Sequence, residues 1–177
     1  MLFDHIAFLD FNFDKELLWH DYNNCRKVNG ANSALAHRED FKYGKIEHIP
    51  TNSENEGARL FKHIESMIGL SKVVNNRTPI YFSFSGDSFL PVHKDSMSGV
   101  WIAMVITGQQ PIYFYNDDKQ LIGHTQYECA MVNGFKYHEV PIKDTKIERL
   151  LLRQYYDCSF QEARSLAEKA GRIKWPS

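Results

Sequence analysis

Between residues 78 and 156 the chain consists of short runs rich in Val, Ile, Tyr, Phe and Thr, separated by turn-forming sequences such as SGDS, TGQQP and NDDKQ. Runs of this composition, with turn signals at short and regular intervals, are typical of an all-β sandwich or barrel. This part of the chain therefore predicts a β core. We expect seven or eight strands, at 79–85, 89–93, 100–107, 111–116, 119–124, 126–132, 137–142 and 146–156.

Helical patterns flank this core. Apolar residues recur at helical spacing over about 14–25 and 53–70, and a short strand is expected near 6–9. Ser159 and Glu162 form an S-x-x-E capping box that predicts a helix over about 159–171. The fold class is thus mostly β with flanking helices (α+β).

The length of 177 residues, without a repeat or a linker, favours a single domain. We expect a mixed N-terminal part over about 1–75, the β core over about 78–156 and the C-terminal helix after it.

Charge and composition argue against several classes of partner. The 21 basic and 22 acidic residues are mixed along the chain, so no basic stripe predicts binding to nucleic acid or to an acidic membrane. No stretch approaches about 18 uninterrupted apolar residues, and the N-terminus lacks the basic start of a signal peptide. The three cysteines are far apart, as is typical of reduced thiols. We therefore expect a soluble, cytoplasmic protein.

The sequence FLPVHKDS places His93 and Asp95 two residues apart at the end of a predicted strand. Side chains at i and i+2 of a strand point to the same side, so both could bind one ion. A third ligand is expected from His138, in KYHEVP on another strand of the barrel. Two imidazoles and one carboxylate on one side of an ion leave the opposite positions open, as non-haem Fe(II) needs for O2 and a co-substrate.

The HxD triplet alone carries little weight, because eight His and eleven Asp in 177 residues give about 0.5 matches by chance. Two other pairs, His37 with Glu39 and His63 with Glu65, have a similar form. The second pair lies in a predicted helix, where i and i+2 diverge by about 200°. The first has no partner further along the chain. His124 is left out of the ligand set, because a surface or satisfied core histidine is the commoner state.

The last predicted strand, 146–156, carries Ile147, Arg149, Leu151 and Arg153 on one face. A buried arginine on an otherwise apolar face needs an anionic partner, and a guanidinium can hold a carboxylate with two hydrogen bonds. A carboxylate of a bound co-substrate would serve. The alternative is an exposed face on which Arg149 pairs with a surface Asp or Glu.

HKD at 93–95, His138 on a strand and Arg149 eleven residues later resemble the Fe(II)/2-oxoglutarate-dependent dioxygenase superfamily, in particular its short prolyl-hydroxylase-like members. The resemblance covers about residues 78–156. It implies a double-stranded β-helix, the jelly-roll or cupin-like core of that family.

The resemblance also implies roles for six residues. Three of them would ligate iron and form the catalytic centre: His93, Asp95 and His138. The other three would hold 2-oxoglutarate, with Arg149 at its distal carboxylate, Arg153 as the second choice for that anchor, and Tyr81 as a polar group on the preceding strand.

The implied activity is that of an oxygenase or hydroxylase. O2-dependent decarboxylation of 2-oxoglutarate to succinate and CO2 would be coupled to hydroxylation of a substrate, either a protein or peptide side chain or a small molecule. Two alternatives remain: a cupin-like metalloenzyme that does not use 2-oxoglutarate, and a non-enzymatic β-barrel that serves as a binding module. Cupins usually show HxH where this chain has HxD, which argues against the first.

Overall fold

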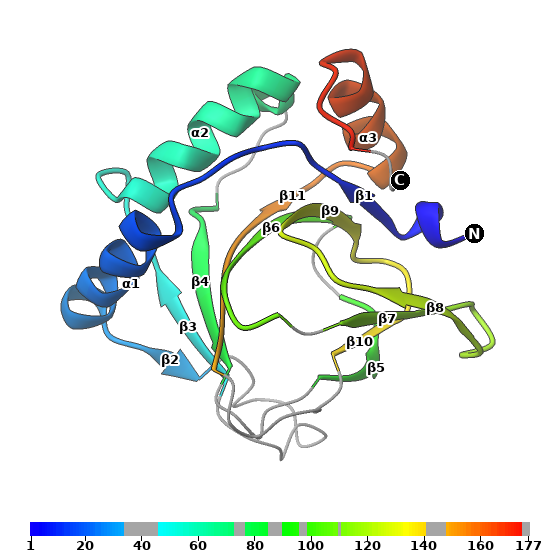
Figure 1. The fold of residues 1–177 in the computed structure, drawn as a ribbon, viewed down its shortest axis with the longest axis horizontal. Helices are drawn as coiled ribbons and strands as arrows, with labels where there is room; N and C mark the ends of the chain where they lie inside the picture. The colour runs from blue at the N-terminus through cyan, green and yellow to red at the C-terminus, as the bar shows by residue number, and fades with distance from the viewer. Residues whose placement is uncertain are drawn as a thin grey trace.

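The computed structural model describes residues 1–33, 46–72, 77–84, 90–95, 99–109, 111–140 and 148–174. The strands of these ranges are β1 (Ile6–Phe8), β2 (Asn32–Ser33), β3 (Ile46–Pro50), β4 (Ile80–Phe84), β5 (Leu90–His93), β6 (Val100–Thr107), β7 (Ile112–Tyr115), β8 (Leu121–Thr125), β9 (Cys129–Asn133), β10 (His138–Val140) and β11 (Arg149–Tyr156). They form a large sheet in the order β1-β9-β6-β11-β4-β3-β2 and a small sheet in the order β5-β10-β7-β8. Figure 1 shows the two sheets facing each other.

From β4 onward the chain passes repeatedly between the sheets. β4, β6, β9 and β11 belong to the large sheet, and β5, β7, β8 and β10 to the small one. All neighbouring strands pair antiparallel. This arrangement is the double-stranded β-helix, so the expected fold class is confirmed. The eight predicted strands correspond to β4–β11, although 85, 89, 141–142 and 146–147 lie outside the described residues.

Three helices cover the outer face of the large sheet (Figure 1): α1 (Lys15–Asn29), α2 (Glu56–Ile68) and α3 (Phe160–Lys169). Short 3-10 turns lie at η1 (Leu2–Asp4) and η2 (Leu70–Lys72). The α1 helix begins where the Asp14 side chain accepts a hydrogen bond from the Leu17 backbone nitrogen, and it runs four residues beyond the predicted end at 25. Ser159 caps α3 by accepting from the Glu162 backbone nitrogen at 3.1 Å, as the capping box predicts.

One buried carboxylate joins the two N-terminal helices to the large sheet. Asp21 of α1 accepts hydrogen bonds from the Tyr81 hydroxyl at 2.7 Å and from the Gly57 backbone nitrogen at 2.9 Å. Because Gly57 lies in the first turn of α2, Asp21 caps that helix from a neighbouring one. A Cβ atom at Gly57 would lie 2.9 Å from the Tyr81 oxygen, so glycine permits this close approach.

Two apolar clusters result from the layering. The outer one packs the helices against the large sheet and the inner one fills the space between the sheets. β11 contributes to both by strict alternation: Leu150 and Leu152 point to the helices, and Leu151 points between the sheets. The same alternation sends Arg149 and Arg153 inward with Leu151.

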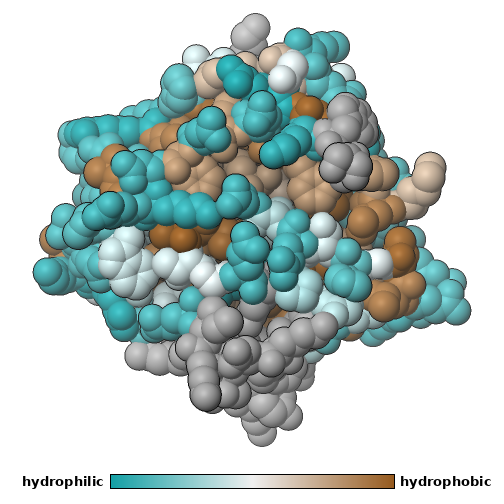
Figure 2. Space-filling model, in the orientation of Figure 1, coloured by the Kyte–Doolittle hydropathy of each residue, from teal (hydrophilic) through white to brown (hydrophobic). Residues whose placement is uncertain are grey.

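Polar side chains cover most of the face seen in Figure 2, and apolar ones gather across its middle. Among the described residues, no helix is both long enough and apolar enough to cross a membrane.

Candidate metal centre

The pairing of β5 with β10 brings the two histidines together. His138 lies opposite His93, whereas Val140 lies opposite Leu90, so β5 contains one extra residue between these two pairs. Such a bulge changes the direction in which the following side chains point. As a result Leu90 and His93, three residues apart, both lie on the inner side, and the two imidazole centres are 4.3 Å apart.

Asp95 completes a three-residue cluster just after β5. Its carboxylate oxygens lie 3.6 Å from His93 Nε2 and 3.8 Å from His138 Nε2, and one potential ligand atom of each residue lies within 4.8 Å of the others. A single ion could therefore contact all three residues. His138 is 2% exposed, while His93 and Asp95 are partly exposed, which leaves the cluster open on one side.

Backbone carbonyls fix the orientation of both imidazoles. His93 Nδ1 lies 2.7 Å from the Pro91 carbonyl oxygen, and His138 Nδ1 lies 2.9 Å from that of Lys136. A carbonyl can only accept, so each Nδ1 carries the proton and each Nε2 keeps a lone pair that faces the cluster. Burial lowers the pKa of His138 to about 4, which keeps it in the neutral form that binds metals.

Trp101 of β6 positions the carboxylate. Its indole Nε1 donates to Asp95 Oδ2 at 2.8 Å, and the backbone nitrogen of Asp95 donates to the Gly134 carbonyl at 2.8 Å. Burial alone would raise the pKa of Asp95. In acid, where the imidazoles are protonated, a hydrogen bond from His93 and the charges of His138 and Arg153 outweigh burial and hold that pKa well below its usual range.

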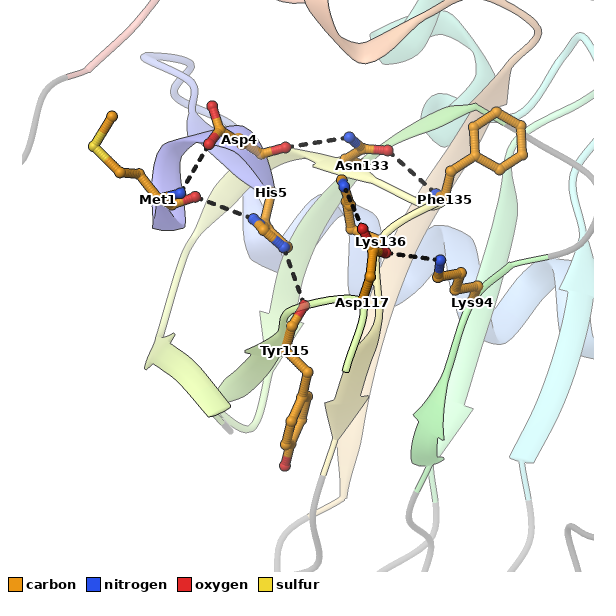
Figure 3. A network of polar contacts seen from close by, with 9 residues as sticks. All are labelled: Met1, Asp4, His5, Lys94, Tyr115, Asp117, Asn133, Phe135 and Lys136. Carbon is orange, nitrogen blue, oxygen red and sulfur yellow. Dashed lines mark hydrogen bonds and ion pairs between the residues drawn. The ribbon is translucent and has the colours of Figure 1, made fainter. Parts of the chain in front are cut away.

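A network of polar contacts braces the segments that carry the ligands (Figure 3). Asp117, in the β7–β8 hairpin, lies 3.1 Å from Lys94 Nζ and 3.6 Å from Lys136 Nζ. Lys94 separates His93 from Asp95 in the chain, and Lys136 supplies the carbonyl that orients His138. One hairpin carboxylate therefore contacts both ligand-bearing segments.

Arg149 begins β11 and is 1% exposed. Its Nη2 donates to the Tyr127 hydroxyl at 3.3 Å, and its guanidinium lies 5.7 Å from the centre of the Phe84 ring. Nε and Nη1 are buried and have no hydrogen-bond partner in the described parts of the chain, and burial lowers the pKa of the group. The alternative of an exposed arginine paired at the surface is therefore wrong for Arg149.

Arg153 points into the same space and is 5% exposed. Its guanidinium lies 4.0 Å from the ring centre of Trp101 and 4.4 Å from that of Phe82, and Nη1 donates to the Tyr155 hydroxyl at 3.1 Å. Because Trp101 also binds Asp95, Arg153 is next to the metal cluster. Thus both predicted arginines lie inside the barrel.

Tyr81 requires a correction. It was expected to face the co-substrate, but its ring belongs to the outer cluster and its hydroxyl binds Asp21 on the helix side of the sheet. His124 is outside the cluster, as expected, and stacks on Tyr113 with ring centres 4.8 Å apart. The sequence analysis missed Trp101 and also His48, which faces inward from β3 next to Phe82. The alternation of Ile46 and His48 was the available signal for the latter.

Comparisons with known proteins agree with this fold. No family model matches the sequence, and no curated protein matches it. A prolyl hydroxylase from Trichoplax adhaerens, in complex with a hypoxia inducible factor oxygen degradation domain peptide fragment, superposes with a TM-score of 0.60 at 12% identity, over 92% of this chain and 86% of that one.

Two bacterial structures are also similar. A Pseudomonas putida prolyl-4-hydroxylase has a TM-score of 0.54 at 15% identity, over 82% of this chain and 88% of the other. A 2OG-Fe(II) oxygenase family protein from Burkholderia pseudomallei has a TM-score of 0.50 at 12% identity, over 80% and 77% of the two chains. At these identities the likeness shows a shared fold.

Proposed function

We propose that this chain is an Fe(II)- and 2-oxoglutarate-dependent oxygenase. Iron would be held by His93, Asp95 and His138, and the distal carboxylate of 2-oxoglutarate by Arg149. The fold shared with two prolyl hydroxylases and a 2OG-Fe(II) oxygenase family protein supports the proposal. The single observation that carries it is the buried Arg149 guanidinium, whose Nε and Nη1 have no partner among the described residues, inside the same barrel as the His-Asp-His cluster.

The donor atoms fit Fe(II). Two neutral imidazoles and one carboxylate on one side of an ion match the ligand set of non-haem Fe(II) oxygenases, whose remaining positions stay open. The backbone carbonyls that hold both Nδ1 protons fix the ligand orientation before any ion arrives. Trp101 fixes Asp95 Oδ2 in the same way, which leaves Oδ1 free to ligate.

Arg149 fits a dicarboxylate. A buried guanidinium with two nitrogen atoms that lack partners is costly unless a ligand compensates it, and a carboxylate can accept two hydrogen bonds from Arg. Tyr127, which accepts from Nη2, holds the side chain in place. The apolar side chains around it, such as Phe84 and Leu151, exclude water from this end of the site.

With both groups bound, the centre would supply O2-dependent oxidation of 2-oxoglutarate to succinate and CO2, coupled to hydroxylation of a substrate C–H bond. No side chain of this chain has to move a proton in that scheme. The residues orient the ligands, balance charge and keep bulk water away, which limits uncoupled oxidation.

The test is anaerobic addition of Fe(II) and 2-oxoglutarate to the purified protein. We expect a weak visible charge-transfer band that saturates with 2-oxoglutarate. His93→Ala should abolish the band, and Arg149→Met should weaken 2-oxoglutarate binding about 100-fold, as expected for lost hydrogen bonds between charged groups. His124→Ala, outside the cluster, is the matched histidine control and should retain the band.

Other outcomes would favour the alternatives. Metal binding without 2-oxoglutarate binding would indicate a cupin-like metalloenzyme. A protein that binds neither would be a β-barrel binding module, and the proposal would be wrong.

A further inference from the structure

The barrel contains more buried positive charge than 2-oxoglutarate needs. Arg149 and Arg153 lie four residues apart on the inner face of β11, and each has at least one buried N–H atom without a hydrogen-bond partner. The two buried carboxylates among the described residues, Asp21 and Glu47, are on the helix side of the sheet, bound to Tyr81 and Arg26 respectively. They cannot neutralise the arginines.

The sum of charges at the site with metal and 2-oxoglutarate bound also indicates an excess of positive charge. A divalent ion, the Asp95 carboxylate, doubly negative 2-oxoglutarate and Arg149 together carry no net charge. Arg153 then adds one positive charge in an interior where charge is poorly solvated. Such a site favours one further anionic group.

A second polar atom without a partner lies close to Arg153. Nε2 of His48 is buried without a hydrogen bond, and the His48 ring is 4.0 Å from the centre of Phe82. The same Phe82 ring lies 4.4 Å from the Arg153 guanidinium. Phe82 therefore contacts both side chains, and the charge of Arg153 is close enough to His48 to lower its pKa. Among the described residues, Arg153 Nε and His48 Nε2 have no hydrogen-bond partner.

The place of this pair suggests what it binds. Arg153 stacks on Trp101, the residue that holds Asp95, so an anion on Arg153 would lie next to the metal centre. Arg149, by contrast, contacts Tyr127 and Phe84, and its hydrogen bonds are directed elsewhere in the barrel. The two guanidinium groups thus define separate positions.

We propose that Arg153 and His48 form a second anion subsite, which binds a carboxylate of the substrate that is oxidised. This inference rests on the function proposed above and gives its substrate class: molecules with a carboxylate near the oxidised carbon. Arg153 would bind that carboxylate through its unpaired Nε–H, with His48 Nε2 donating a second hydrogen bond. Hydroxylation of this substrate would use O2 and 2-oxoglutarate and release succinate and CO2, as in the reaction given above.

The experiment uses the anaerobic complex of the protein with Fe(II) and saturating 2-oxoglutarate. Three probes are titrated by calorimetry: hexanoate, its uncharged analogue hexanamide, and N-acetylglutamate α-amide, which represents the acidic side chain of a peptide. We expect a carboxylate probe to bind at least about 10-fold more tightly than the amide. Which of the two carboxylates binds better distinguishes a free acid from a peptide side chain.

Two arginine variants separate this subsite from the co-substrate site. Arg153→Met should weaken binding of the carboxylate probe about 10- to 100-fold and change 2-oxoglutarate affinity less than about 3-fold. Arg149→Met should show the opposite pattern. Arg153→Lys, which keeps the charge, should recover part of the affinity, and His48→Gln should lose less than Arg153→Met.

The subsite is disproved if Arg153→Met weakens 2-oxoglutarate as much as Arg149→Met does, because Arg153 would then belong to the co-substrate site. Equal binding of hexanoate and hexanamide, or no binding of any probe, would also overturn it. These results differ from failure of the proposed function, in which wild-type protein with Fe(II) does not bind 2-oxoglutarate at all.

Discussion

The two faces of the large sheet differ in how their buried ionisable side chains are paired. On the helix side, Asp21 accepts from Tyr81 and Gly57, and Glu47 pairs with Arg26 at 2.8 Å. On the inner side, Arg149, Arg153 and His48 each retain buried nitrogen atoms without a partner. Since buried polar groups are normally satisfied, the paired groups of the first face are explained by folding, and the unpaired nitrogen atoms of the second are available to bind a ligand.

This difference distinguishes residues that stabilise the fold from residues that are available to bind a ligand. A group whose partners all lie within the chain contributes to the free energy of unfolding. A group without partners lowers that free energy in the absence of its ligand, which is a common feature of functional sites. Four predictions test this difference, beginning with the largest effect.

The largest effect is expected from loss of an inner-face ligand. His138→Ala removes one of three metal ligands, so Fe(II) affinity should fall by more than about 100-fold. This loss exceeds the one usually seen when a residue that only hydrogen-bonds to a metal ligand is replaced. Binding is measured by anaerobic metal titration. His124→Ala should bind iron normally. Equal losses of affinity in the two variants would show that His93, Asp95 and His138 are not the metal site.

A helix-side carboxylate should matter for stability. Asp21→Ala leaves the buried Tyr81 hydroxyl and the Gly57 backbone nitrogen without their acceptor, so the free energy of unfolding should fall by about 3 kcal/mol. Urea unfolding measures this value. Asp21→Asn keeps an acceptor oxygen and should cost less. A loss below about 1 kcal/mol in Asp21→Ala would contradict the structural role of this face.

An inner-face arginine should behave in the opposite way. Arg149→Met removes a buried charge without a carboxylate partner and retains an apolar side chain, so the ligand-free protein should keep its stability or gain about 1 kcal/mol. The matched variant on the helix side, Arg26→Met, removes an ion pair from the buried Glu47 carboxylate and should be destabilised. Thermal unfolding of both variants without metal gives the comparison. If Arg149→Met were the less stable of the two, the distinction between the faces would fail.

The smallest effect concerns pH. Burial first, and the charge of Arg153 second, lower the pKa of His48 from 6.5 to about 4. The unfolded state then binds more protons between these values, so the free energy of unfolding falls as pH decreases from about 6.5 towards 4 and is unaffected above that range.

In His48→Gln the free energy of unfolding should not show this decrease at low pH, because glutamine does not titrate. Relative to its value at pH 7, the metal-free variant should retain about 1 kcal/mol more stability at pH 5 than the wild type, after allowance for partial exposure of the ring. Urea unfolding at the two pH values measures the difference, in which the metal-site histidines, common to both proteins, cancel. Parallel pH dependence in the two proteins would show that His48 is not buried in the neutral form.

Much of the fold could be predicted from the sequence, because strands and turns from β4 to β11 have local signals. The strands β2 and β3 were missed, since β3 contains Glu47 and His48 side by side and ends at Pro50. The direction of Tyr81 was also not predictable. β4 is buried on both faces, so the alternation of Tyr81 and Ser83 with phenylalanine does not indicate which side faces the helices.

The metal-site residues could be predicted from the sequence, but the residues around them could not. His93, Asp95 and His138 were found from residue type and strand position, and the structure brings them together. Trp101 and His48 act across the barrel, through contacts between residues distant in sequence. No local pattern encodes such contacts.

The bulge in β5 lets the chain hold one more residue between Leu90 and His93 than a regular strand would allow when both side chains face inward. The pairings of His138 with His93 and of Val140 with Leu90 differ by one residue in register. Deletion of either Pro91 or Val92 would keep every ligand residue and the HKD triplet. It would leave a regular strand, in which Leu90 and His93 are two residues apart and still share a face. A homologue that is one residue shorter at this point could therefore carry the same metal ligands on the same side of the barrel.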